Sequence, residues 1–239
     1  MRRKIFLSNF IFIFLCFFAF VSCKAQINNS DYFKKKYFGF CFGTNYTFIK
    51  IIENKNFEKD SVIDVVNKPN LGIKIGIPIN FKITRRVNIC VFPSLSFSTS
   101  NLNYYISKHN NINTIKVYTD FNSIENSVLL KYNSVRTNNI NTYFLFGLKP
   151  EYFFTSSGKF YIKEEDSIID SYTMPFKKFD ISYELGVGIN LFAQNNIQSF
   201  ELIFSSGLFN IAVKDDSEFT QIFDYNYLKI ITLAYIFNK

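Results

Sequence analysis

The sequence predicts an all-β fold: an eight-stranded, antiparallel, up-and-down β-barrel that crosses a membrane. Beyond the first 25 residues, no apolar run reaches the 18 residues that a membrane-crossing helix needs. Eight segments instead alternate between apolar and polar residues with a period of two. The connections between these segments are alternately long and short, which is typical of the smallest transmembrane barrels.

The composition is that of one folded domain. The chain has 239 residues, of which 48% are hydrophobic and 19% are charged, so a disordered chain is excluded. The net charge of +8 falls to +4 when the four cations of the first segment are removed, which are Arg2, Arg3, Lys4 and Lys24. That mild balance, with only the short cluster Lys34-Lys35-Lys36 before a strand, does not favour nucleic acid as a partner.

The first 25 residues have the organisation of a signal peptide. A basic start, Met1–Lys4, precedes the apolar run Ile5–Val21, and Cys23-Lys24-Ala25 offers small residues at the first and third places before a cut. We expect residues 1–25 to be a signal peptide, 26–36 a periplasmic N-terminal segment and 37–239 the barrel. Two alternatives are a lipoprotein signal acylated at Cys23, for which Phe20 fits poorly, and a retained membrane anchor.

The first three predicted strands alternate most regularly. They cover residues 38–48, 71–83 and 87–98, and each places one face of apolar side chains against a face rich in Gly, Ser, Asn and Lys. The apolar face consists of Phe38, Phe40, Phe42, Thr44, Tyr46 and Phe48, then Leu71, Ile73, Ile75, Ile77, Ile79, Phe81 and Ile83, then Val87, Ile89, Val91, Leu95 and Phe97. This face is expected to point outward, toward lipid.

Five further strands follow the same pattern more loosely. Their apolar faces are Ile124, Val128, Leu130 and Tyr132; Phe144, Phe146, Leu148 and Tyr152; Ile181, Tyr183, Leu185, Val187, Ile189 and Leu191; Phe200, Leu202, Phe204 and Leu208; and Ile231, Leu233, Tyr235 and Phe237. Eight is an even number of strands, as in bacterial outer-membrane barrels, and a sheet that spans the bilayer must close so that every backbone group finds a partner.

The connections distinguish the two ends of the predicted barrel. The first, third, fifth and seventh span roughly 13 to 22 residues and centre near residues 60, 109, 167 and 216, whereas the others span roughly 3 to 7. Because paired residues share a face, Ile83 and Val87 require an odd turn, Thr84-Arg85-Arg86, at the periplasmic rim.

Aromatic residues and prolines predict further features of the barrel wall. Aromatic residues near the strand ends are expected to form interfacial girdles, and they are Tyr37, Tyr104, Tyr105, Tyr118, Tyr132, Tyr152 and Phe154. Pro78, Pro93 and Pro150 lack the N–H of a sheet ladder, so bulges are expected there. A soluble β-sandwich or a water-soluble lipid-carrying barrel would also alternate; the rhythm of the connections favours the membrane barrel.

The interior of the predicted barrel is polar and filled by side chains. Its charged residues are expected to neutralise one another in pairs, and they are Lys74, Lys82, Lys131 and Lys149 against Glu125, Glu151, Asp180, Glu184 and Glu201. The alternative is a path for protons or ions. Cys41 and Cys90 fall at interior positions and are interpreted as small core residues rather than a disulfide.

Catalytic chemistry has little support in the sequence. His109 is the single histidine, and Ser107 stands two residues before it, in a predicted loop. The loop acids Glu164-Glu165-Asp166 and Asp215-Asp216 could bind a divalent ion, but solvated loop charge is the simpler interpretation. We therefore predict a protein that is not an enzyme, with no catalytic, cofactor-binding or metal-binding residues and no cofactor.

The order of these segments resembles the PorT/SprT family of the Bacteroidetes, outer-membrane β-barrel proteins associated with type IX secretion and gliding motility. The resemblance covers nearly the whole chain after the signal peptide and depends on residues 38–46 (FGFCFGTNY), 92–97 (FPSLSF), 129–134 (LLKYNS), 183–188 (YELGVG) and 204–208 (FSSGL). One departure is Asn126-Ser127, where the family pattern has an apolar residue followed by proline. Asn126 is thus expected to face lipid, unless that strand begins near an interface.

The resemblance implies a barrel in the cell outer membrane that assists protein secretion. Its partners would be outer-membrane lipid and other proteins of the secretion apparatus, with no nucleic acid and no small-molecule substrate. The alternative functions are a general structural or adhesive barrel that acts through its long outer loops, and a lipid-modifying enzyme that uses His109.

Overall fold

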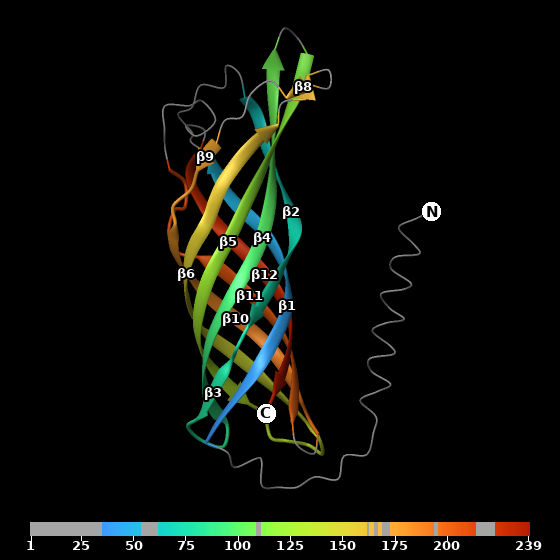
Figure 1. Cartoon of the computed structure of the whole chain (residues 1–239), viewed down its shortest axis with the longest axis vertical. Coiled ribbons are helices and arrows are strands. Elements are labelled where there is room, and N and C mark those ends of the chain that lie inside the picture. Colours follow the sequence, from blue (N-terminus) through green and yellow to red (C-terminus); the bar gives the residue numbers. More distant parts are fainter. Residues whose placement is uncertain are drawn as a thin grey trace, which may run out of the picture.

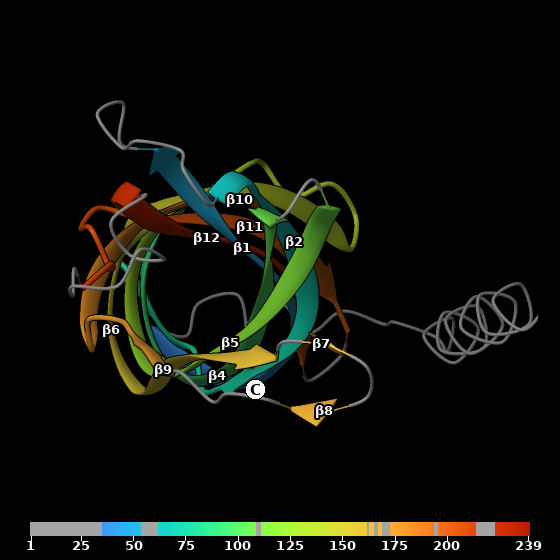
Figure 2. The same ribbon diagram turned by 90° about the horizontal axis from the view of Figure 1, so that it is seen from above.

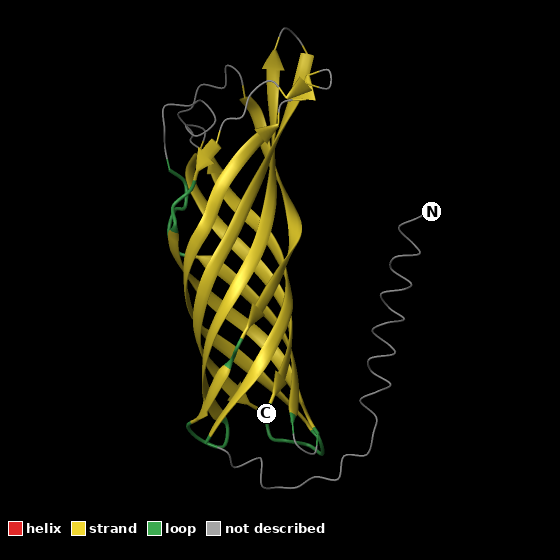
Figure 3. Ribbon diagram, viewed as in Figure 1, coloured by secondary structure: helices red, strands yellow, loops and turns green. Residues whose placement is uncertain are grey.

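Eight wall strands close on themselves in the computed structural model of the chain, as Figure 1 shows from the side and Figure 2 from one end. The structure describes residues 35–53, 62–108, 111–161, 163–164, 167–168, 173–193, 196–213 and 223–239. Nearly all of them are in strands (Figure 3). This part of the chain contains no helix that is long and apolar enough to cross a membrane.

The wall is an antiparallel meander that closes by pairing its first strand with its last. Its strands are β1 (Lys36–Glu53), β2 (Val62–Gly76) continued by β3 (Ile79–Lys82), β4 (Val87–Lys108), β5 (Asn111–Asn133), β6 (Ile140–Tyr161), β10 (Phe179–Phe192), β11 (Ile197–Gly207) and β12 (Phe223–Asn238). β12 pairs with β1, and β6 pairs with β10, which completes the ring. The short strands β7 (Lys163–Glu164), β8 (Ser167–Ile168) and β9 (Thr173–Pro175) lie in the connection after β6.

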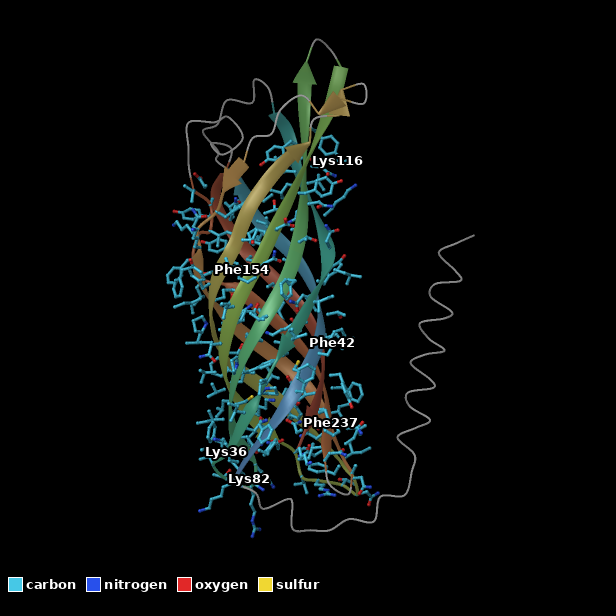
Figure 4. All side chains as sticks on the ribbon, in the orientation of Figure 1. Lys36, Phe42, Lys82, Lys116, Phe154 and Phe237 are labelled. Atoms are coloured by element: carbon cyan, nitrogen blue, oxygen red, sulfur yellow. The ribbon has the colours of Figure 1, made fainter. Side chains whose placement is uncertain are left out.

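The predicted alternation is confirmed along the wall. The apolar face points outward, with Leu71 75% exposed and Phe144 69% exposed, while the intervening polar residues, such as Lys74 and Ser96, are buried inside. In Figure 4 the apolar side chains Phe42 and Phe237 lie between Lys36 and Lys82 at one end and Lys116 toward the other. We call this outer apolar surface the belt.

The short turns are also confirmed, and they define the turn end of the barrel. Between β3 and β4, the backbone N–H groups of Ile83 and Thr84 donate to the carbonyl of Val87 at 2.9 and 3.0 Å. The Thr84 hydroxyl accepts hydrogen bonds from the N–H groups of Arg86 and Val87 at 3.2 and 3.0 Å. The turn therefore has the three residues that the register required, Thr84-Arg85-Arg86.

The strands extend further toward the other end, the outer end, than the sequence predicted. The third connection, expected to be a long loop from residue 98 to 124, is instead a continuation of β4 and β5, which remain paired up to Lys108 and Asn111. β1 likewise continues to Glu53, and β2 begins at Val62. The predicted long loops near residues 60 and 109 were too long, because paired strands occupy most of those segments; their central residues, 54–61 and 109–110, lie outside the described residues.

The prolines do not produce the expected bulges. Pairing between β4 and β5 keeps one register through Pro93, and pairing between β6 and β10 keeps one register through Pro150. At Pro78 the strand is interrupted, but β2 and β3 pair with β1 in the same register on both sides of the interruption. The carbonyls of Pro78 and Pro93 still accept hydrogen bonds at 2.9 and 3.0 Å. The missing N–H of proline thus leaves the register unchanged, although the ladder between β5 and β6 is interrupted opposite Pro150, between Glu125 and Val128.

The predicted aromatic girdle is confirmed only in part. Tyr118, Tyr132, Tyr152 and Phe154 point outward and are exposed, and Phe154 packs edge to face with Phe97 at 6.3 Å between ring centroids. Tyr104, by contrast, is fully buried inside the barrel. Tyr37 also points inward, and its hydroxyl accepts a hydrogen bond from the Asn88 amide at 3.2 Å.

Candidate functional site

The interior near the middle of the barrel carries a cluster of buried charges, which we call the charged layer. Glu125 on β5 contacts two lysines: its Oε2 is 2.6 Å from Lys74 Nζ, and its Oε1 is 3.4 Å from Lys149 Nζ. Lys149 Nζ is also 3.1 Å from Glu151 Oε2, and all four side chains are at most 2% exposed. Buried charges are tolerated when opposite charges and hydrogen bonds surround them, as they do here.

A second ion pair lies closer to the turn end. Lys131 Nζ is 2.6 Å from Glu201 Oε1, which also accepts a hydrogen bond from the Tyr143 hydroxyl. The Lys131 ammonium sits 5.2 Å from the centre of the Tyr143 ring, close enough for a cation–π contact. The interaction joins β5, β6 and β11 across the lumen and fills it.

The predicted pairing of interior charges is confirmed for six of the nine residues and wrong for Glu184 and Asp180. Glu184 accepts a hydrogen bond from the Ser205 hydroxyl at 3.0 Å, and Asp180 accepts from the backbone N–H groups of Ile181 and Phe209 at 2.7 and 3.1 Å. Within the described residues neither carboxylate has an ion pair with a lysine. Lys82 is only half-buried, because it lies at the rim beside the first turn.

Toward the outer end, the interior becomes apolar. On β5, Phe121 lies four residues beyond Glu125, and its ring centroid is 5.9 Å from that of Phe153 and 5.2 Å from that of Phe176. These rings belong to a buried cluster that we call the aromatic plug, made of Ile49, Val65, Leu102, Tyr104, Val117, Phe121, Phe153, Phe176, Ile211, Leu228 and Ile230. The plug was not predicted from the sequence, because its members lie in segments that were interpreted as loops.

Two connections fold over the plug and help to close the mouth of the barrel. Phe176 follows β9 and Ile211 follows β11, and these segments meet in a bridge between Phe176 and Ala212. The backbone N–H of Lys177 donates to the Ile211 carbonyl at 2.8 Å, and the N–H of Ile211 donates to the Asn226 carbonyl on β12 at 3.0 Å. The described interior is thus filled by a charged layer and by an apolar plug above it.

Beyond the belt, the outer end of the wall becomes an open sheet. The belt ends at Phe97 on β4 and Ile124 on β5, and both strands continue well past these residues, as the tall ribbon in Figure 1 shows. Pairing between β1 and β2 stops at Thr47 and Asn70, although both strands continue. In the described residues, β2 from Val62 to Pro69 pairs only with β4, and the Asn67 amide reaches the Ile49 carbonyl at 2.6 Å.

Most of the residues that the sequence offered for chemistry lie outside the part of the chain that the structure describes. His109, Asp166, Asp215 and Asp216 lie outside the described residues, and so do Cys23 and the whole predicted signal peptide. Cys41 and Cys90 are buried free cysteines in the interior, as predicted. Among the described residues, no three His, Cys, Asp or Glu side chains are grouped so that they could hold a metal ion.

Comparison with known proteins gives a family and a set of similar folds. The family described as outer membrane protein beta-barrel domain matches residues 24–213. The solved structure of the attachment invasion locus protein Ail of Yersinia pestis is 12% identical, with 86% of this chain and 99% of that chain covered and a TM-score of 0.40.

Two further solved structures are similar over most of the chain. Neisserial surface protein A is 9% identical, with 84% of this chain and 95% of that chain covered and a TM-score of 0.40. OprG from Pseudomonas aeruginosa is 12% identical, with 85% and 93% covered and a TM-score of 0.39. No curated protein sequence matches the chain.

Proposed function

The chain belongs to the family of outer membrane protein β-barrel domains and lies in the cell outer membrane, and we propose that it is a non-enzymatic, PorT-like barrel that assists protein secretion across that membrane. It does so by contacting other proteins of the secretion apparatus and has no conduit of its own. The secretion role depends on the resemblance of its strand segments to the PorT/SprT family.

The observation that carries the proposal is the filled interior. The ion pairs between Glu125 and its two lysines are buried inside the lumen, and the rings of Phe121, Phe153 and Phe176 pack above them. A solute would have to displace both layers to pass, and an eight-stranded barrel is too narrow to keep an aqueous channel beside its own side chains. A barrel built in this way acts through its outer surfaces, which supports a role as an accessory rather than as the pore.

Two measurements test this function. The purified mature protein in a planar lipid bilayer is expected to give no stepwise conductance, and regular open steps would contradict the filled interior. A strain that lacks the gene is expected to retain secreted cargo in the periplasm. Normal surface display of cargo in that strain would remove the secretion role and leave the barrel itself untouched.

A specific observation favours a second candidate, an adhesive or structural barrel. Beyond the belt lie the ribbon of β4 and β5 and the part of β2 that, among the described residues, pairs only with β4. Strand edges of this kind can pair with an extended segment of another protein. Shortening the ribbon by removing residues 103–116 is then expected to abolish binding to a host or envelope surface while secretion continues. Loss of secretion in the same variant would favour the first candidate.

A further inference from the structure

A polar side chain interrupts the belt at Asn126 on β5. Its outward neighbours along the strand are Ile124, 54% exposed, and Val128, 47% exposed, and Asn126 points outward with them. The register is secure on both sides, because Asn126 pairs with Pro93 on β4, and Glu125 pairs with Glu151 on β6. Asn126 therefore lies in the wall itself, well inside a strand that begins at Asn111, and not at an interface where the strand starts.

Two prolines flank this residue, one on each neighbouring strand. Pro93 is its partner on β4, and the register of β5 with β6, given by Glu125 with Glu151 and Val128 with Leu148, brings Pro150 opposite Asn126. The N–H of Phe153 donates to the carbonyl of Lys178, the residue just before β10, so alternation along β6 turns the nitrogen of Pro150 toward β5. Proline has no N–H, and the Asn126 carbonyl therefore receives no ladder hydrogen bond from Pro150.

The Asn126 side chain adds to this deficit. Within the described part of the chain, its amide has no hydrogen-bond partner, and it is exposed inside the belt, between Ile124 and Val128 on the same strand. Acyl chains can neither donate nor accept hydrogen bonds, so polar groups inside a bilayer are found against other protein groups. A polar group of a protein at the same depth is the chemistry that satisfies both the carbonyl and the amide.

We infer that Asn126 is the centre of an intramembrane interface between two copies of this chain. A carboxamide both donates and accepts, so it is complementary to itself. A two-fold axis along the membrane normal places each residue at the same depth as its copy, and near the axis Asn126 meets Asn126 of the partner subunit. The compact rings of Pro93 and Pro150 on either side let the two walls approach closely, as small residues do between membrane helices.

The inference is independent of the secretion proposal, since it concerns the chain alone in a lipid bilayer. Disulfide crosslinking tests the geometry: Asn126→Cys in the mature protein, oxidised in outer membranes, is expected to give a covalent dimer on a non-reducing gel. Leu233→Cys is the matched control, since Leu233 is 57% exposed on β12, across the ring from β5. The native Cys41 and Cys90 are buried and do not interfere. No dimer with Asn126→Cys, or equal dimer with Leu233→Cys, would overturn the inference.

A second measurement tests the hydrogen bonds. The dimer affinity of labelled protein in lipid vesicles is measured by energy transfer as the vesicles are diluted with lipid. In Asn126→Leu this affinity is expected to fall roughly three- to thirty-fold, the range for polar contacts between membrane segments. Asn126→Gln keeps the amide and is expected to restore most of the affinity. Gel mobility before and after heating verifies that each variant is folded. A monomeric wild type, or folded Asn126→Leu that dimerises as well as the wild type, would refute the interface.

Discussion

Replacing Glu125 by Gln is the most direct test of the charged layer. Glu125 is 1% exposed and is the acid shared by Lys74, at 2.6 Å, and Lys149, at 3.4 Å. Gln keeps the shape of the side chain but removes its charge, so Lys74 loses the carboxylate it contacts, while Lys149 retains Glu151 at 3.1 Å. Removing one member of a buried pair typically costs about 3–5 kcal/mol, and we expect the free energy of unfolding to fall by that amount.

The assay is equilibrium unfolding in urea of the mature protein refolded into lipid vesicles. Because the chain contains no tryptophan, circular dichroism and gel mobility report the transition. The control is the double variant Lys74→Met with Glu125→Gln, which removes both charges of the closest pair and is expected to be more stable than Glu125→Gln alone. A loss of unfolding free energy below about 1 kcal/mol for Glu125→Gln would refute the reasoning. So would a double variant whose loss equals the sum of the losses of the two single variants, because neither result fits a coupled buried pair.

Three further predictions follow from buried positions. Phe121→Ala removes the ring that contacts Phe153 and Phe176, and urea unfolding is expected to show a loss of about 3–5 kcal/mol. Gly147→Ala is expected to prevent folding, seen as loss of the heat-modifiable gel band, because its Cβ would lie 2.0 Å from the Val128 carbonyl oxygen. Gly43→Ala, whose nearest atom is at 3.1 Å, is expected to keep that band. Cys41 and Cys90 are expected to react with a water-soluble maleimide only after unfolding; rapid labelling of the folded barrel would contradict their burial.

The wall could be predicted from the sequence because lipid imposes one strong rule. Every second residue of the belt has to be apolar, so that Leu71 through Ile83 on one strand or Ile181 through Leu191 on another show the alternation without any knowledge of their neighbours. The turn at Thr84-Arg85-Arg86 followed from the same rule, since paired residues must share a face. Bulges at the prolines were wrong because a missing donor leaves the register of a paired strand intact.

The outer half was missed because the polarity of the alternation inverts there. Along β4, the outward residues change from Leu95 and Phe97 to the half-buried Thr99 and Asn101, while the inward residues change from Ser96 and Ser98 to Leu102 and Tyr104. β4 keeps one register with β5 across this point, although the pairing of β2 with β4 and that of β5 with β6 each shift there. A period-two pattern whose phase reverses looks irregular in the sequence, so these segments were interpreted as loops.

The inversion also marks where the membrane ends. Below it the outside has to be apolar and the inside can be charged, and above it water surrounds the wall and the apolar side chains turn inward to form the plug. On β5 the change falls between Phe121, which is buried inside, and Ile124, which is exposed outside. Asn126 lies on the membrane side of that change, with Val128 and Leu130 continuing the belt below it. The apolar residues around it offer no hydrogen bonds, and this is the observation that the proposed contact between two copies of the chain explains.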